Sequence, residues 1–159
     1  MYIFVDVDGV LNPDIPREGG FIQLGYPEPD NGYSRSGFKL KLHPIYGIWL
    51  LELAESTRAE LIWGTTWQEY ANEWVGKPLG LPEMPHLNLN ERKFSENLGS
   101  IKGRQAWKYA GDEKFVYFDD EPNIGYCIEG SNGLHIYVDY RYGLMKKHII
   151  EAMKFLKTT

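Results

Sequence analysis

The sequence has little cysteine, no long apolar run and no excess of basic residues. Its only cysteine, Cys127, has no second cysteine with which to form an internal disulfide, and this favours a reducing compartment. No apolar stretch approaches the roughly 20 residues that a membrane-spanning helix needs. The net charge of -5 provides no basic field for a membrane surface or for duplex nucleic acid, although a local cationic patch could still hold a nucleotide or a nucleic-acid end. We therefore expect a cytoplasmic protein that does not bind membranes.

The length of the chain favours a single domain. At 159 residues it can bury one well-filled core, but it is too short for two comfortable ones. A predicted strand begins at Tyr2, which leaves no room for a signal peptide before it. Residues 12–41 and 77–100 are rich in Pro and Asn and show no clear period. We predict one domain over residues 1–159, with a flap-like or cap-like insertion at 12–41 and an irregular insertion at 77–100.

Short apolar runs typical of buried strands alternate with segments of helical period. The predicted strands are residues 2–5, 59–63, 114–118 and 134–138. The predicted helices are residues 44–56, 103–110, 122–129, 145–156 and a segment that begins after a capping box at Thr65 or Thr66 and ends before Gly76. Such alternation predicts an α/β fold: a three-layer, Rossmann-like parallel sheet with helices on both faces and a small flap or minimal cap.

Polar residues gather where the predicted strands end. In order along the chain they are Asp6, Asp8, Thr65, Thr66, Asp119 and Asp120, with Lys102 just before the helix that precedes the third strand. Because ligands bind beyond the carboxyl ends of parallel strands, we expect all these groups to face one crevice.

The chemistry of such a crevice follows from the residue types. Converging carboxylates repel one another, and a hard cation relieves the repulsion. Oxygen ligands without a nearby His or Cys favour Mg²⁺ over Zn²⁺. Threonine hydroxyls and the free N–H groups at helix starts suit an anion, and Lys102 offers it a positive charge. Together these groups indicate phosphoryl transfer through an aspartyl-phosphate.

The order of the motifs resembles that of the haloacid dehalogenase-like (HAD) superfamily. The stretch DVDGV at 6–10 is similar to its first motif, IWGTT at 62–66 to the second, Lys102 to the third and VYFDDE at 116–121 to the acidic fourth. With the segment HPIYGIWLLELA at 43–54, these stretches most resemble the HAD domain described in Swiss Army Knife RNA-repair proteins. This resemblance is weakest over residues 14–40 and 77–98.

The resemblance implies a role for each residue. Asp6 would be the nucleophile, and Asp8 would protonate the leaving group and then activate water. Thr65, Thr66 and Lys102 would bind the phosphoryl group, and Lys102 would also hold Asp6. The metal ligands implied for Mg²⁺ are Asp6, the backbone carbonyl of Asp8, Asp119 and Asp120. The implied activity is a phosphatase acting on a phosphomonoester, with a nucleotide or a nucleic-acid terminal phosphate as the narrower expectation.

Ordinary structural roles compete with several of these assignments. One of Thr65 and Thr66 is expected to serve only as a helix cap, and Thr65, nearer the strand end, is the favoured phosphate ligand. Lys93 is an alternative candidate for the role of Lys102. Asp120 could contact the metal ligands rather than the metal itself. The histidines lack metal-ligand spacing and are interpreted as structural or surface residues.

The sequence is also compatible with two other functions. A PIN-like metal-dependent nuclease is also a small α/β domain with acids at strand ends, and it would cleave a phosphodiester without a covalent intermediate. The Asp-x-Asp-Gly motif, the Thr-closed strand and the lysine argue against it. A catalytically inactive HAD-like binding module is the second alternative, and the intact set of acids argues against that.

Overall fold

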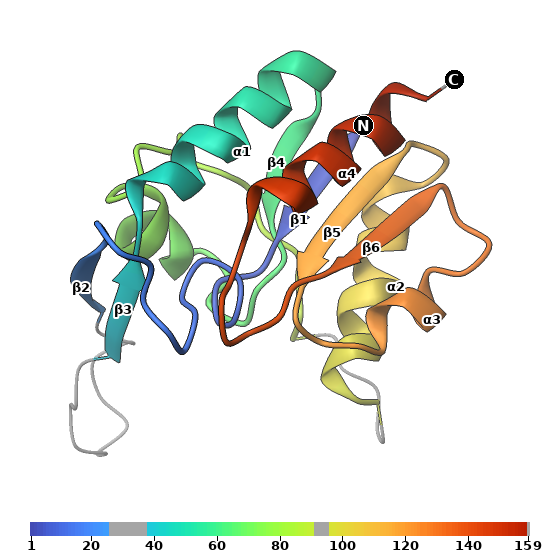
Figure 1. The fold of residues 1–159 in the computed structure, drawn as a ribbon. Helices are drawn as coiled ribbons and strands as arrows, with labels where there is room; N and C mark the ends of the chain where they lie inside the picture. The colour runs from blue at the N-terminus through green and yellow to red at the C-terminus, as the bar shows by residue number, and fades with distance from the viewer. Residues whose placement is uncertain (26–37, 91–95, 159) are drawn as a thin grey trace.

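The central sheet has four parallel strands and places β1 in its interior (Figure 1). The structure, a computed structural model, describes residues 1–25, 38–90 and 96–158. The sheet order is β4-β1-β5-β6, and its strands are β1 (Tyr2–Val5), β4 (Glu60–Trp63), β5 (Phe115–Asp119) and β6 (Gly133–Tyr137). Every pairing is parallel. The predicted strands are therefore confirmed to within about one residue at each end.

Helices cover both faces of the sheet, as predicted (Figure 1). One face carries α1 (Pro44–Thr57) and α4 (Lys146–Lys157), which pack against each other. The other face carries α2 (Leu98–Ala110) and α3 (Ile124–Cys127). This is the three-layer α/β architecture expected from the alternation of strands and helices. Within the described residues, no helix combines the length and apolarity needed to cross a bilayer.

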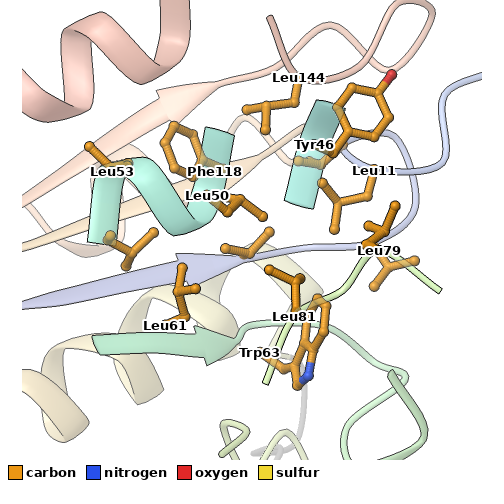
Figure 2. Close-up of a cluster of buried hydrophobic side chains, with 14 of the residues drawn as sticks. Leu11, Tyr46, Leu50, Leu53, Leu61, Trp63, Leu79, Leu81, Phe118 and Leu144 are labelled. Carbon is orange, nitrogen blue, oxygen red and sulfur yellow. The ribbon is translucent and has the colours of Figure 1, made fainter. Parts of the chain in front are cut away.

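The alternation of side chains along β1 divides the core into two layers. Ile3 and Val5 point into the layer beneath α1 and α4, whereas Phe4 points into the layer beneath α2. The first layer is the larger, and Figure 2 shows Leu50 and Leu53 of α1 facing the sheet there. A strand buried on both faces reads as a continuous apolar run, which explains why β1 could be found from its sequence.

The predicted flap contains a two-stranded antiparallel hairpin. Its strands are β2 (Phe21–Gly25) and β3 (Phe38–Leu42), with Phe21 opposite Leu42. Residues 26–37, between the two strands, lie outside the described part of the chain. Leu40 and Leu42 are buried in the larger core layer, so the hairpin is anchored to the domain by its second strand.

Helix α2 begins five residues earlier than predicted. The side chain of Asn97 caps it by accepting a hydrogen bond from Ser100 N at 2.8 Å. Lys102 therefore lies inside this helix, and the prediction that it precedes a helix is wrong. Helix α3 is also shorter than the predicted helix over residues 122–129.

The predicted helix after Thr66 is present but begins later than predicted. Turns span residues 66–69, Tyr70 and Ala71 are α-helical, and Asn72–Gly76 (η1) continues them with the wide turn of a π-helix. Its Asn72 side chain accepts hydrogen bonds from Trp63 Nε1 at 2.7 Å and Met84 N at 2.9 Å, and donates to Met84 O. These long-range bonds, which no local pattern reports, hold the segment in its wide turn.

Candidate active site

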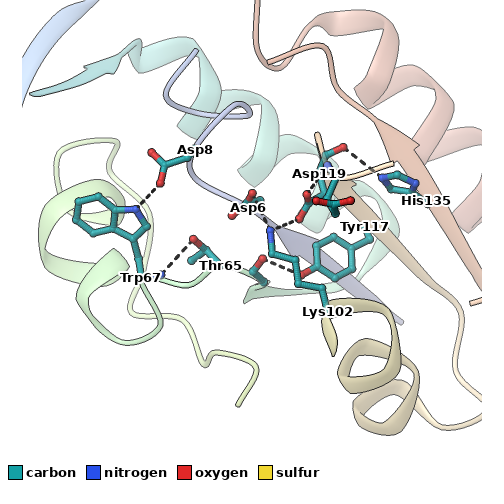
Figure 3. A network of polar contacts seen from close by, with 10 residues as sticks. Asp6, Asp8, Thr65, Trp67, Lys102, Tyr117, Asp119 and His135 are labelled. Atoms are coloured by element: carbon teal, nitrogen blue, oxygen red, sulfur yellow. Dashed lines mark hydrogen bonds and ion pairs between the residues drawn. The ribbon is translucent and has the colours of Figure 1, made fainter. Parts of the chain in front are cut away.

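Three buried charged side chains meet beyond the carboxyl ends of β1 and β5 (Figure 3). Lys102 Nζ donates to Asp6 Oδ2 at 2.9 Å and to Asp119 Oδ2 at 2.7 Å. Their relative exposures are 5% for Asp6, 2% for Lys102 and 0% for Asp119. We call these three residues the inner site. The structure thus brings together three groups that the sequence predicts to share a crevice.

The fold explains why these side chains converge. Strands β1 and β5 are neighbours in parallel, and Asp6 N donates to Phe118 O at 3.0 Å, so the two acids leave adjacent strand ends. Glu121 N fixes the second acid by donating to Asp119 Oδ1 at 2.8 Å. Lys102 reaches both from the second turn of α2, which covers that face of the sheet.

Two acidic side chains share one basic side chain in the inner site. Burial raises the pKa of Asp6, although the Lys102 charge acts against it. Burial, and then the charge of Asp6, raise the pKa of Asp119 well above its ordinary value of 3.8. Burial alone would lower the pKa of Lys102, but the charges of Asp6 and Asp119 outweigh it and raise that pKa. One ammonium therefore faces two carboxylates.

Asp120 adds a third carboxylate beside this pair. One oxygen from each of Asp6, Asp119 and Asp120 lies within 4.8 Å of the others. Burial, and then the charge of Asp6, raise the pKa of Asp120. Crowded carboxylates take up protons or bind a cation, and a set of oxygen atoms suits Mg²⁺. The residues present therefore fit the ion that the sequence resemblance implies.

Gly9 allows the chain to pass close to Asp120. Its φ of +78° lies in the left-handed region that favours glycine. A Cβ atom on Gly9 would lie 2.6 Å from Asp120 Cγ, which is too close for any ordinary contact. The chain therefore turns tightly after the two acids of the first motif, and this turn lies against the acidic fourth motif.

Asp8 lies in a different environment from Asp6. Its side chain is exposed, and each carboxylate oxygen accepts one hydrogen bond: Oδ1 from Asn12 Nδ2 and Oδ2 from Trp67 Nε1, both at 2.9 Å (Figure 3 shows the second). Asn12 Oδ1 accepts from Lys41 N at 2.8 Å, which fixes the orientation of the Asn12 amide. We call Asp8, Asn12 and Trp67 the rim. Sequence reasoning missed Asn12 and Trp67 as site residues, although Asn12 lies two residues beyond the first motif.

The two threonines occupy different places. Thr65 is buried, its Oγ1 accepts from Trp67 N at 3.3 Å, and its side-chain hydrogen bond acts to lower the pKa of Asp6. Thr66 is exposed and lines the cavity described next. Thr66 therefore has the open path to a ligand, while Thr65 supports the nucleophile candidate. Which of them contacts a phosphoryl group stays a prediction.

The inner site opens into a cavity of about 460 Å³. Its described walls come from the loop after β1, from β3, from the start of α2 and from the loops after β4, β5 and β6. The lining includes carboxylates as well as Lys39, Lys41 and Tyr140. This volume lies in the range of pockets that hold small-molecule ligands.

The remaining candidates lie elsewhere or have structural contacts. Lys93, the alternative to Lys102, lies outside the described residues. His43 Nδ1 accepts from Ile45 N at the start of α1, and His148 Nδ1 accepts from Met145 N at the start of α4. Both rings therefore cap helices, in agreement with the structural interpretation of the histidines.

The chain is similar to a solved structure, but it matches no family model and no curated protein. A solved structure described as a HAD superfamily (subfamily III A) hydrolase from Legionella pneumophila aligns with 98% of this chain and 84% of its own, at 17% identity and a TM-score of 0.49. An identity this low transfers neither activity nor substrate, so the function is inferred from the site itself.

Proposed function

We propose that this chain is a HAD-like, Mg²⁺-dependent phosphohydrolase that acts on a phosphomonoester through an aspartyl-phosphate. The observation that carries the proposal is the environment of the Asp6 carboxylate. It is buried at the end of β1, its Oδ2 is 2.9 Å from Lys102 Nζ, and it lines an open cavity. A buried acid held by a lysine and facing a cavity is suited to nucleophilic attack.

The acids around Asp6 would hold the metal. Asp6, Asp119 and Asp120 would supply carboxylate oxygens, and Asp8 would supply its backbone carbonyl, as the resemblance implies. When bound, Mg²⁺ supplies positive charge that offsets the charge of the phosphoryl oxygens and of the crowded acids. Lys102 stays protonated beside the nucleophile and so supplies a second, permanent cation to the same phosphoryl group.

The two acids of the first motif then divide the chemistry. An Asp6 oxygen attacks phosphorus, the bond from phosphorus to the leaving oxygen breaks, and Asp8 gives its proton to that oxygen. Asp8, now ionised, takes a proton from water, whose oxygen attacks phosphorus and releases phosphate with the Asp6 carboxylate restored. The exposed position of Asp8, on the wall of the cavity, supports this second role.

The geometry of the site does not by itself define the substrate beyond a phosphomonoester. A nucleotide or the terminal phosphate of a nucleic acid, as in RNA repair, is proposed only from the sequence resemblance. A PIN-like nuclease would use the same acids for metal alone, and it would give Lys102 no place beside a nucleophile. An inactive binding module would retain the cavity without turnover.

The test is phosphate release from p-nitrophenyl phosphate, mononucleotides and oligonucleotides with 3′ or 5′ phosphates, each with Mg²⁺ and with EDTA. We expect release that needs Mg²⁺ and that disappears in Asp6→Asn, because the amide cannot attack phosphorus. Asp112→Asn, an exposed acid outside the cavity, is the matched control and should keep full activity.

Trapping separates the proposal from its rivals. A fluoroberyllate adduct on the wild-type protein, observed by fluorine NMR and absent in Asp6→Asn, would support the covalent route. Full activity in Asp6→Asn would refute it, and cleavage of internal phosphodiesters without the adduct would favour the nuclease.

A further inference from the structure

Strand β3 presents its two faces to different surroundings. Leu40 and Leu42 are buried in the larger core layer. Lys39 and Lys41, which alternate with them, line the same cavity as the inner site. Because successive side chains of a strand point to opposite faces, the packing of the two leucines directs both lysines to the cavity.

These lysines differ from Lys102 in how their charge is used. Lys102 Nζ contacts two carboxylates, at 2.9 and 2.7 Å. Lys41 Nζ donates instead to the backbone carbonyl of Asp14 at 2.8 Å, which is uncharged. The Lys39 side chain is exposed and makes no hydrogen bond or ion pair with any other described residue. Two ammonium groups therefore line an acid-rich cavity without a carboxylate partner among the described residues.

The position of these lysines relative to Asp8 is fixed by the backbone. Lys41 N donates to Asn12 Oδ1 at 2.8 Å, and Asn12 Nδ2 donates to Asp8 Oδ1 at 2.9 Å. The strand that carries the lysines is thus tied through one side chain to the proposed general acid. An anion bound at the lysines would occupy a defined place in the same cavity as a phosphoryl group at Asp6.

We propose that Lys39 and Lys41 form a second anion site, which binds a phosphate or carboxylate group that the substrate carries in addition to its reacting phosphate. The substrate is then a phosphomonoester with two anionic groups, one at Asp6 and one at β3. This deepens the proposed function, because the first of these positions rests on it. The cavity of about 460 Å³ has room for such a molecule.

The experiment measures binding rather than turnover. Alkylphosphonates and α,ω-alkanebisphosphonates of matched and increasing chain length are titrated by calorimetry in Mg²⁺ buffer. At the chain length that spans the two sites, we expect the bisphosphonate to bind about tenfold more tightly than the monophosphonate. Having two equivalent ends accounts for only a twofold gain, so a larger ratio requires a second contact.

Variants of β3 then assign that contact. Lys39→Ala and Lys41→Ala should reduce the ratio to the twofold statistical value while leaving monophosphonate affinity within about twofold. Lys39→Arg keeps the charge and should keep the ratio. Lys154→Ala removes an exposed lysine of α4 outside the cavity, and it should change neither affinity.

The outcomes separate this site from the proposed function. A ratio of two or less at every chain length, or a large ratio that survives in both alanine variants, overturns the second anion site. Hydrolysis of p-nitrophenyl phosphate by the wild-type protein, measured in parallel, reports on the proposed function alone. Tight bisphosphonate binding without hydrolysis would keep the site and refute the phosphatase, whereas hydrolysis without preferential bisphosphonate binding would keep the phosphatase and overturn the site.

Discussion

The inner site and the rim hold their acids in opposite ways. Asp6 and Asp119 are buried, lie at the ends of neighbouring strands and share one ammonium group. Asp8 is exposed and is held by neutral donors from two loops, the Trp67 indole and the Asn12 amide. The inner site is therefore coupled to the stability of the fold, whereas the rim can be altered with little effect on it. This difference separates residues that support the chemistry from those that direct protons and substrates.

The largest effect is expected from removing the inner cation. Lys102→Met leaves two buried carboxylates without their partner, and breaking a buried ion pair from one side costs about 3–5 kcal/mol. We expect the free energy of unfolding in urea to fall by about 3 kcal/mol at neutral pH without metal, and activity to fall about a thousandfold. Added Mg²⁺ should restore part of the stability, because it replaces the lost positive charge.

The control for this variant is Lys108→Met, which removes an exposed lysine from the same helix. Equal stability losses in the two variants would mean that the ion pairs of Lys102 do not hold the inner site together. The inner site would then be no more closely coupled to the stability of the fold than the rim is.

The rim should respond in rate rather than in stability. Trp67→Phe keeps an aromatic ring but removes the N–H that holds Asp8 Oδ2. We expect kcat/KM to fall about 30-fold, or about 2 kcal/mol, for alkyl phosphates, whose leaving group needs a proton. For p-nitrophenyl phosphate, whose leaving group needs little protonation, the fall should be small.

Trp107→Phe, a partly exposed tryptophan of α2 outside the cavity, is the matched control. Equal losses of kcat/KM for both kinds of substrate in Trp67→Phe would show that the tryptophan only stabilises its loop. Unfolding in urea, measured on the same samples, should differ little between the two variants.

The smallest effect concerns Asp120, at the border between the two regions. A carboxyl whose pKa is raised on folding binds its proton more tightly in the folded state, so its ionisation as pH rises lowers stability. Asp120→Asn should therefore stabilise the metal-free protein at neutral pH by about 0.5–1 kcal/mol, a small gain because solvent screens this partly exposed group. The gain should vanish as pH falls toward the ordinary value of 3.8.

Saturating Mg²⁺ should reverse the order, because the wild-type protein gains more from the ion than Asp120→Asn does. Thermal unfolding across pH, with and without the metal, checks both statements, with Asp112→Asn as the control. If Asp120→Asn is less stable than the wild-type protein at neutral pH without metal, repulsion between Asp120 and the neighbouring acids does not destabilise the fold.

Sequence reasoning located the strands and the inner site because both depend on simple patterns. The run of apolar residues before Asp6 and the one before Asp119 mark buried strands, and parallel order alone brings their ends together. Lys102 was identified from its match to a motif, although its helix was placed too late. The glycines of α2 weaken its helical pattern, yet a Cβ on Gly103 would lie only 2.7 Å from Cys127 Cβ. Tight packing against α3, rather than helix propensity, explains why a glycine occupies position 103.

The rim could not be predicted in the same way. Trp67 reaches Asp8 across 59 positions of sequence, from turns that replace the first part of the predicted helix. Those turns depend on the contacts of Asn72 with Trp63 and Met84, which have no local signature. The hairpin lysines show a plain alternation with leucine, but the cavity they face exists only once the sheet has formed.

The close approach of Gly9 to Asp120 limits which substitutions homologous chains can accept at these positions. These positions lie 111 residues apart in the chain, yet a Cβ atom at the first would meet the carboxyl group at the second. Position 9 therefore cannot change alone: a chain that gains a side chain there must also shift or replace its acid at position 120. Homologous chains with a side chain at position 9 should then lack or displace the acid at position 120, and such paired substitution would mark lineages in which the acidic cluster has been lost.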